Sequence, residues 1–237
     1  MDGRTLKEAR RKKQWTQEQA AQALGVTQAY LSMMEKGRRT LSEPFVCKAF
    51  KVLNLPPTAL PLQIAATPVG SQKNDFGAEL AALGYPGFAY LQVGKRFGRH
   101  AERRRNPAQV LLEALNQPDL DARVCEGLPW LALTYVDMDW NWLMRNAKLQ
   151  DRQNRLGFTV SLAYEVAQNK RDSQRESRLR QFMAALENSR LAREDTFCHD
   201  SMTQAERVWL REHRSPAAAH WNLLTDLKVE HLAYAAR

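Results

Sequence analysis

The chain has 237 residues, of which 44% are hydrophobic and 26% charged, and its 35 Lys and Arg against 26 Asp and Glu give a net charge of +9. This apolar content excludes a chain that is disordered throughout. No run approaches the roughly 18 apolar residues of a membrane-spanning helix. The positive charge favours a polyanionic partner, because binding such a partner releases counterions.

The cysteines and the N-terminus indicate the compartment. Cys47, Cys125 and Cys198 are odd in number and far apart, so a disulfide framework is not expected and a reducing cytosol fits. The first residues, MDGRTLKEARRKK, have no apolar core for a signal peptide. We therefore expect a soluble cytoplasmic protein with no membrane contact.

The first predicted helix ends in a basic run. Leu6, Ala9 and the aliphatic stem of Arg10 form its inner side, and residues 10–13, RRKK, precede Trp15. A charge run of this kind is either a solvated face or, beside a recognition helix, a set of cations that reach phosphate. The sequence leaves both readings open.

Residues 16–37, TQEQAAQALGVTQAYLSMMEKG, predict two short helices joined by a tight turn. Thr16 and Thr27 are placed to cap them, because a hydroxyl can accept a hydrogen bond from a free N–H of the first turn. Gly25 is expected to end the first helix, since a residue without Cβ adopts the left-handed conformation at low cost. Gly37 is expected to end the second.

The two helices have an inward and an outward side. Ala20 and Ala21 are small enough for the helices to cross closely, and Tyr30, Leu31 and Met34 share the inward side of the second helix by spacings of three and four. The side chains left outward are Gln17, Gln28, Ala29, Ser32 and Lys36. Amides and small apolar groups suit the DNA major groove, where an amide bonds an adenine edge and a methyl group touches thymine.

This pattern resembles the Cro/C1-type helix-turn-helix family of phage repressors and bacterial regulators. The resemblance runs from about residue 6 to residue 60 and rests on TQE at 16–18, Ala21, GV at 25–26, YLS at 30–32 and EKGR at 35–38. Met33 departs from the family, because many members carry a basic residue there. One phosphate contact is expected to be missing as a result.

The resemblance implies sequence-specific binding to double-stranded operator DNA. The base contacts that it implies come from Gln28, Ala29 and Ser32. The phosphate contacts that it implies come from Gln17, Thr27, Lys36, Arg38 and Arg39, and Gln17 would also orient Gln28. The alternative is that these residues are ordinary solvated polar groups on an amphipathic helical domain.

The rest of the chain predicts an all-α protein of two domains. A helix begins near Pro44 and carries Cys47 on its packed side, and a short final helix near residues 57–60 completes a five-helix repressor-like domain in residues 1–64. Residues 65–74, AATPVGSQKN, are small, polar and broken by Pro and Gly, which is typical of a linker. Residues 75–237 are expected to form a larger helical domain for dimerisation or partner binding.

The larger domain shows helical patterns along most of its length. They cover residues 76–83, 107–117, 118–128, 140–149, 153–170, 179–186, 204–213 and 217–237. The second of these regions follows the densest basic patch of the chain, which includes Arg103–Arg105. That patch either extends the contact with DNA or forms an exposed loop.

Catalytic and metal chemistry are not expected. Cys198, His199, Asp200 and His213 lack the spacing of a zinc site. Asp137 and Asp139 suggest a magnesium-binding carboxylate pair, but no phosphate-binding loop precedes them, so we expect them to cap a helix. The chain also contains no nucleotide-binding or hydrolase motif. We expect no enzyme activity and no cofactor.

A dimeric repressor is the leading interpretation, because one helix-turn-helix unit reads only a few base pairs. Residues 128–135, LPWLALTY, and 137–158, DMDWNWLMRNAKLQDRQNRLGF, are similar to regulators of bacterial operons that also encode a nucleotidyltransferase-like toxin. This similarity implies an autoregulating antitoxin that binds its cognate toxin through the C-terminal domain. The alternatives are a ligand-responsive regulator with a small molecule between Trp-rich helices, and an enzyme that uses Asp137 and Asp139.

Overall fold

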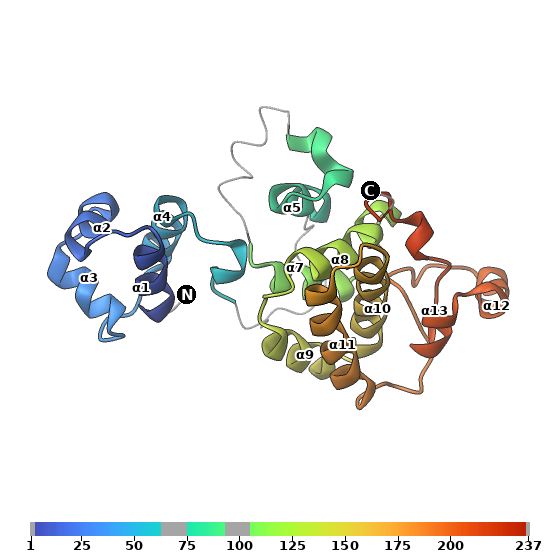
Figure 1. The fold of residues 1–237 in the computed structure, drawn as a ribbon. Coiled ribbons are helices and arrows are strands. Elements are labelled where there is room, and N and C mark those ends of the chain that lie inside the picture. The colour runs from blue at the N-terminus through green and yellow to red at the C-terminus, as the bar shows by residue number, and fades with distance from the viewer. Residues whose placement is uncertain (1–2, 63–74, 93–104, 236–237) are drawn as a thin grey trace. The chain divides into compact units, whose positions relative to one another are not determined.

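A computed structural model describes residues 3–62, 75–92 and 105–235 (Figure 1). The chain divides into two compact units, Met1–Gln63 and Ile64–Arg237. Both units are predominantly helical, and the strands of the described residues are one parallel pair of two residues each. The all-α prediction is confirmed, whereas the predicted linker at 65–74 lies outside the described residues. Within the described ranges, no helix has the length and apolar character needed to cross a bilayer.

Over residues 3–62, the first unit contains four α-helices and a single 3-10 turn (Figure 1). Its elements are α1 (Gly3–Lys12), α2 (Gln17–Leu24), α3 (Gln28–Glu35), α4 (Glu43–Leu53) and η1 (Pro57–Ala59). The fifth predicted helix is therefore one turn of 3-10 helix, which lies among Pro56, Pro57 and Pro61. Proline lacks the N–H that a longer helix needs, so the turn does not extend.

All four α-helices of this unit contribute to one apolar core. Its buried members are Leu6, Ala9, Ala20, Ala21, Leu24, Leu31, Met34, Ala49, Leu53 and Leu55. Cys47 is exposed, and the prediction that it packs is wrong. On α4 the buried positions are Val46, Ala49 and Leu53, and a residue next to Val46 points about 100° away from that stripe.

The second unit is built around one long helix, α10, which packs against α8, α9, α11 and α13 (Figure 1). Its helices are α5 (Phe76–Leu83), α7 (Pro107–Leu115), α8 (Ala122–Thr134), α9 (Trp140–Leu149), α10 (Gln153–Asn169), α11 (Ser173–Glu187), α12 (Gln204–His213) and α13 (Pro216–His220). Its other described elements are the 3-10 turns η2 (Pro86–Gln92) and η4 (Val229–His231) and the strands β1 (Asp195–Thr196) and β2 (Leu223–Leu224).

Helix α8 differs from its prediction at both ends. It begins after Asp121, whose carboxylate accepts a hydrogen bond from the Arg123 N–H, rather than at Pro118. It also continues through Pro129 to Thr134. A proline inside a helix removes one hydrogen bond, but Leu128 and Leu131 are fully buried on either side of it. This burial offsets the local cost.

The C-terminal segment is not the continuous helix that its hydrophobic spacing predicts. Helix α13 ends at Trp221, and Asn222 takes a left-handed conformation with φ of 53°. The chain then runs extended, and Leu223 and Leu224 pair in parallel with β1. The spaced residues Trp221, Leu224 and Leu227 are buried as their pattern indicates, although not on one helix.

A glycine in α10 allows a tryptophan to lie directly on that helix. A Cβ at Gly157 would come within 2.4 Å of the Trp221 ring. The Trp221 indole N–H donates to Ser161 Oγ at 2.7 Å, and this hydroxyl donates to the Gly157 carbonyl at 2.9 Å. The glycine that lowers the helix propensity of this segment is therefore needed for close packing.

Arg155, also on α10, links the helices of the second unit to its C-terminal segments. Its side chain is 0% exposed and donates to Asp195 at 2.9 and 3.0 Å and to Asp200 at 3.0 Å. It also donates to the carbonyls of Leu115 and Gln117 at the end of α7. A buried guanidinium is tolerated because its donors are used in this way.

We expect Arg155→Met to destabilise the second unit by about 3–5 kcal/mol, because the change leaves the half-buried Asp195 carboxylate and the carbonyls of Leu115 and Gln117 without their donor. Chemical denaturation of the full chain, followed by Trp fluorescence, measures the loss. Arg180→Met is the control, since Arg180 pairs with Glu176 on the surface of α11, and such pairs contribute less than about 1 kcal/mol. Equal effects of the two changes would contradict this assignment.

Candidate nucleic-acid interface

Caps at three positions define both ends of α2 and the start of α3. Thr16 Oγ1 accepts from the Gln19 N–H, and the Gln19 side chain accepts in return from the Thr16 N–H, which forms a capping box. Gly25 ends α2 with φ of 68°. Thr27 then caps α3 by accepting from the Tyr30 N–H. These caps are those that the sequence predicts.

Packing against the core leaves one side of α3 toward solvent. Leu31 and Met34 are buried in the core of the first unit, and Tyr30 packs at its edge. Of the predicted DNA-contacting residues, Gln17 and Ser32 are half-buried, and the exposed ones are Thr27, Gln28, Ala29, Lys36, Arg38 and Arg39. They come from the start of α2, from α3 and from the turn after it.

Beneath this exposed side lies a buried ion pair. Arg10 Nε donates to Glu35 Oε1 at 2.6 Å, and Arg10 Nη2 donates to Glu35 Oε2 at 3.1 Å. Both side chains are nearly inaccessible to solvent. Arg10 Nη1 also donates to the Trp15 carbonyl at 2.8 Å, so α1, the end of α3 and the segment before α2 are joined at one point.

Two glutamines extend this ion pair to the surface. Gln17 Nε2 donates to Glu35 Oε2 at 2.8 Å. Gln28 Nε2 donates in turn to Gln17 Oε1 at 2.8 Å. The structure therefore places Gln28 at the end of a chain of hydrogen bonds that begins at Arg10, and the Gln17–Gln28 bond is the one that the family resemblance implies.

The bond with Gln17 fixes which atoms of Gln28 remain available. Its Oε1 and its second Nε2 hydrogen take no part in that bond. A carbonyl oxygen and an amide hydrogen side by side match the N6 and N7 edge of adenine. Ala29 and Ser32 supply a methyl group and a hydroxyl on the same exposed side.

The sequence did not reveal the role of Glu35 and gave Arg10 an incomplete one. The prediction buried only the stem of Arg10 and counted its guanidinium in the basic run at residues 10–13, whereas the structure pairs that guanidinium inside the domain. Arg10 lies four residues after Leu6, on the buried stripe of α1. A cation on such a stripe needs an anion nearby, and this was the signal available in the sequence.

The remaining cations near α3 differ in their surroundings. Lys13 donates to the Val52 carbonyl at 2.8 Å and lies 4.9 Å from the centre of the Trp15 ring, so it is held against the domain. Arg39 lies over the Tyr30 ring, 5.9 Å from its centre. Lys36 and Arg38 are exposed beside it. The exposed positive charge therefore gathers at the C-terminal end of α3.

Of the basic patch that includes Arg103–Arg105, the structure describes only Arg105, and this residue lies in ion pairs rather than in an exposed loop. Arg103 and Arg104 lie outside the described residues. Arg105 pairs with Glu79 of α5 at 2.9 Å and with Glu113 of α7, so its charge is used within the second unit.

The acidic and metal-type residues noted in the sequence have structural partners. The Asp139 carboxylate caps α9 by accepting from the Trp142 N–H at 2.9 Å. Cys198 is buried, Asp200 accepts from Arg155, and His213 stacks on Trp209. Among the described residues, no three His, Cys, Asp or Glu side chains converge as a metal site would require.

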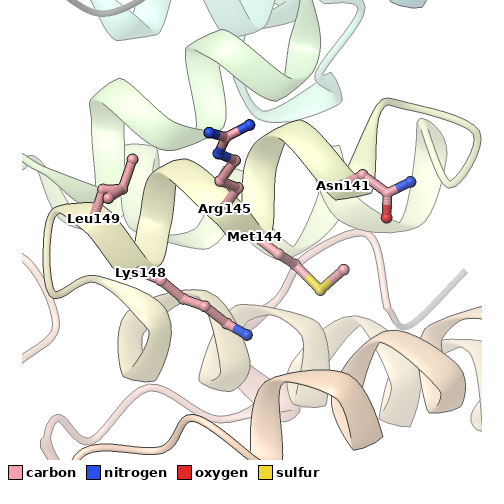
Figure 2. Close-up of a pocket in the computed structure, with 5 residues that line it drawn as sticks. All are labelled: Asn141, Met144, Arg145, Lys148 and Leu149. Carbon is pink, nitrogen blue, oxygen red and sulfur yellow. The ribbon is translucent and has the colours of Figure 1, made fainter.

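Two tryptophans of the second unit, Trp140 and Trp221, fill space between its elements. Trp140 stacks on Phe182 with ring centres 4.1 Å apart, and Trp221 lies on Gly157. A hollow of about 470 Å³ lies instead on the surface of α9, where Asn141, Met144, Arg145, Lys148 and Leu149 line it (Figure 2). The lining is amphipathic, and Leu149 is 74% exposed.

The Arg10–Glu35 pair makes the stability of the first unit sensitive to acid. Burial alone would raise the pKa of the Glu35 carboxyl, but the hydrogen bonds from Arg10 and Gln17 outweigh it and hold that pKa below its usual value. A lowered folded-state pKa contributes stability above the unfolded value of about 4.3, and this contribution is lost as the pH falls through the folded value.

We expect Glu35→Gln to lower the stability of this unit by about 3 kcal/mol at pH 7, since it leaves Arg10 as an unpaired buried cation. The variant should also lose less stability than the unsubstituted chain between pH 5 and pH 3. Urea unfolding over this range measures both effects, with Glu18→Gln on the exposed side of α2 as the control. An unchanged pH slope in Glu35→Gln would refute the pKa assignment.

Comparison with known proteins assigns the first unit. Residues 6–60 match the family model for the helix-turn-helix. Searches of curated proteins and of solved structures found no match. No match thus covers residues 61–237, and the similarity of the C-terminal domain to antitoxin-type regulators stays a prediction. Residues 6–60 thus match the Cro/C1-type helix-turn-helix family, and this match supports a DNA-binding transcriptional regulator.

Proposed function

We propose that this regulator is a sequence-specific repressor that reads its operator through the exposed side of α3. The observation that supports this proposal is the hydrogen bond that holds Gln28 to Gln17, because a fixed amide discriminates between bases better than a free one. Gln28, Ala29 and Ser32 are assigned to base edges. Gln17, Thr27, Lys36, Arg38 and Arg39 are assigned to the phosphate backbone.

The ends of the helices support the phosphate assignment. Gln17 is the first residue of α2, where backbone N–H groups lack helical partners and the helix dipole favours an anion. One hydrogen of its amide also remains beyond its bonds to Glu35 and Gln28. Lys36 caps the C-terminal end of α3 and presents its charge to solvent, with Arg38 following.

The protein is proposed to bind as a homodimer. One recognition helix reads few base pairs, and two copies on a palindrome supply the affinity that a single genomic site requires. The second unit is proposed to provide the dimer contact and a binding function rather than catalysis, with a site of action in the cytoplasm. Asp139 supports this view, since its carboxylate caps α9.

We expect Gln28→Ala to relax base preference and to cost roughly 1–3 kcal/mol on the specific operator. Lys36→Ala is the matched comparison, because it should weaken all sequences alike and reduce the slope of affinity against salt by about one charge. Titration of operator and random DNA at two salt concentrations measures both effects. Equal losses on operator and random DNA for Gln28→Ala would rule out the base contact.

The finer proposal is that the chain is an antitoxin that represses its own operon and binds the cognate toxin. Besides the sequence similarity at 128–158, the surface of α9 supports this proposal, because Met144 and Leu149 add apolar groups to a surface that also carries Arg145 and Lys148 (Figure 2). Within the part of the chain that the structure describes, neither Arg145 nor Lys148 has an ion-pair partner. Two unpaired cations beside apolar side chains suit an acidic surface on the toxin.

This surface also distinguishes the alternative of a ligand-responsive regulator. A small-molecule site is normally concave and mostly apolar. The hollow on α9 is lined by one helix, and Trp140 and Trp221 pack against Phe182 and Gly157. These observations favour a protein partner on α9.

Reversing both charges, in Arg145→Glu with Lys148→Glu, should reduce capture of the toxin encoded in the same operon by at least about tenfold and leave operator binding unchanged. Co-expression and co-purification of the full chain with the toxin measures capture. Arg178→Glu is the control, since Arg178 is an exposed arginine on α11. Full capture by the double variant would place the toxin elsewhere, and a missing toxin gene would end the antitoxin proposal.

A further inference from the structure

Helix α12 lies at the edge of the second unit, where a small apolar core holds it (Figure 1). This core consists of Met202, Leu210 and Leu224, and Leu210 is the buried residue of α12 itself. A surface ion pair adds to it, because Arg211 lies 2.7 Å from Glu194. Most of the surface of α12 is therefore open to solvent or to a partner.

The open side of α12 carries an apolar stripe. Ala205, Val208 and Trp209 are separated by three and four residues along the helix, so they share one side, and this side is turned away from Leu210. Val208 is 48% exposed and Trp209 is 52% exposed. Single exposed hydrophobic residues are common, but a valine and a tryptophan together on one stripe are typical of a contact surface.

The Trp209 ring is held in place before any partner binds. His213 stacks on it with ring centres 4.3 Å apart and planes 6° apart. The His213 Nδ1–H also donates to the Trp209 carbonyl at 2.8 Å. A side chain fixed in this way loses little freedom on association, and it still exposes half of its surface.

We propose that the stripe formed by Ala205, Val208 and Trp209 is the contact between two copies of the chain, with the two α12 helices antiparallel across a two-fold axis. This inference rests on the homodimer proposed above and names its surface. An axis beside the middle of the stripe sets Val208 of one copy against Trp209 of the other, and the small Ala205 leaves room for the ring.

The charges beside the stripe suit a second copy in this arrangement. Glu206 and His213 lie on one flank of the stripe toward opposite ends of α12, so antiparallel pairing brings Glu206 of each copy near His213 of the other. Both bonds from Thr203 to the Glu206 carboxylate use Oε2, and Oε1 takes no part in them. Glu212 opposes the dipole at the C-terminal end of its own helix, and the antiparallel pair places it beside the favourable N-terminal end of the other. Each half of the surface supplies what the other half lacks, as a two-fold contact requires.

The size of this contact indicates a weak dimer. A helix of 10 residues is about 15 Å long, so a pair of them buries much less than the roughly 800 Å² per partner of a stable interface. We expect a dissociation constant in solution on the order of 100 µM. Two copies on adjacent half-sites reach an effective concentration in the millimolar range, which suffices to close the contact on DNA.

Sedimentation equilibrium of the full chain tests the contact without DNA, with Cys47→Ser to prevent disulfides between molecules. We expect the parent to pass from monomer to dimer between about 10 and 500 µM. Val208→Lys should stay monomeric, because like charges meet across the axis, and an equal mixture of Val208→Lys and Val208→Glu should dimerise again. Leu149→Lys, which changes an exposed leucine on α9, is the control and should behave as the parent does.

Titration of the chain's own promoter DNA gives the second readout. We expect two copies of the parent to bind cooperatively, and Val208→Lys to lose at least about tenfold of that cooperativity while it keeps the affinity of a single copy. Dimerisation by Val208→Lys, or a mixture that stays monomeric, would overturn the α12 contact and leave the homodimer in place. A parent that is monomeric in solution and binds the promoter as a single copy would overturn both. The expected sedimentation result without any promoter binding would count against the repressor proposal alone.

Discussion

The buried pair between Arg10 and Glu35 is the interaction on which the proposed DNA-binding surface depends. Two charges inside a small domain are costly to desolvate, and removing either partner leaves the other uncompensated. The pair is retained at the point where α1, the end of α3 and the segment before α2 meet. Glu35 also accepts from Gln17, which holds Gln28. The orientation of one surface amide is thereby set by an ion pair in the interior, and the stability of the domain and the proposed base contact of Gln28 depend on the same carboxylate.

The second unit uses a similar device for a different purpose. Arg155 is fully buried on α10 and satisfies the end of α7 together with Asp195 and Asp200. Burial would lower the pKa of the Arg155 guanidinium, yet the carboxylates raise it, so it stays charged. The same guanidinium faces Cys198. A group that is needed for packing therefore also places a positive charge beside the buried Cys198 sulfur.

The two units differ in how they expose apolar groups. In the first unit the aromatic side chains surround one core, and Met33 on α3 is half-exposed. In the second unit Leu149 on α9 and Trp209 on α12 are more exposed than core residues of their size. Trp209 is covered on one ring face by His213, whereas Leu149 lies open beside Arg145 and Lys148 (Figure 2). The α9 surface is for this reason the stronger candidate for contact with a different protein.

The sequence by itself determined the features that depend on neighbours along the chain. The caps at Thr16 and Thr27, the left-handed glycine at Gly25 and the spacing of α10 follow from local chemistry, and with them the helix-turn-helix. Only the tertiary structure decided the partner of Arg10, the exposure of Cys47, the passage of α8 through Pro129 and the extended path after Trp221. Each of these depends on contacts between residues far apart in the chain, where burial outweighs local propensity. Periodicity reports which residues are buried but not what covers them.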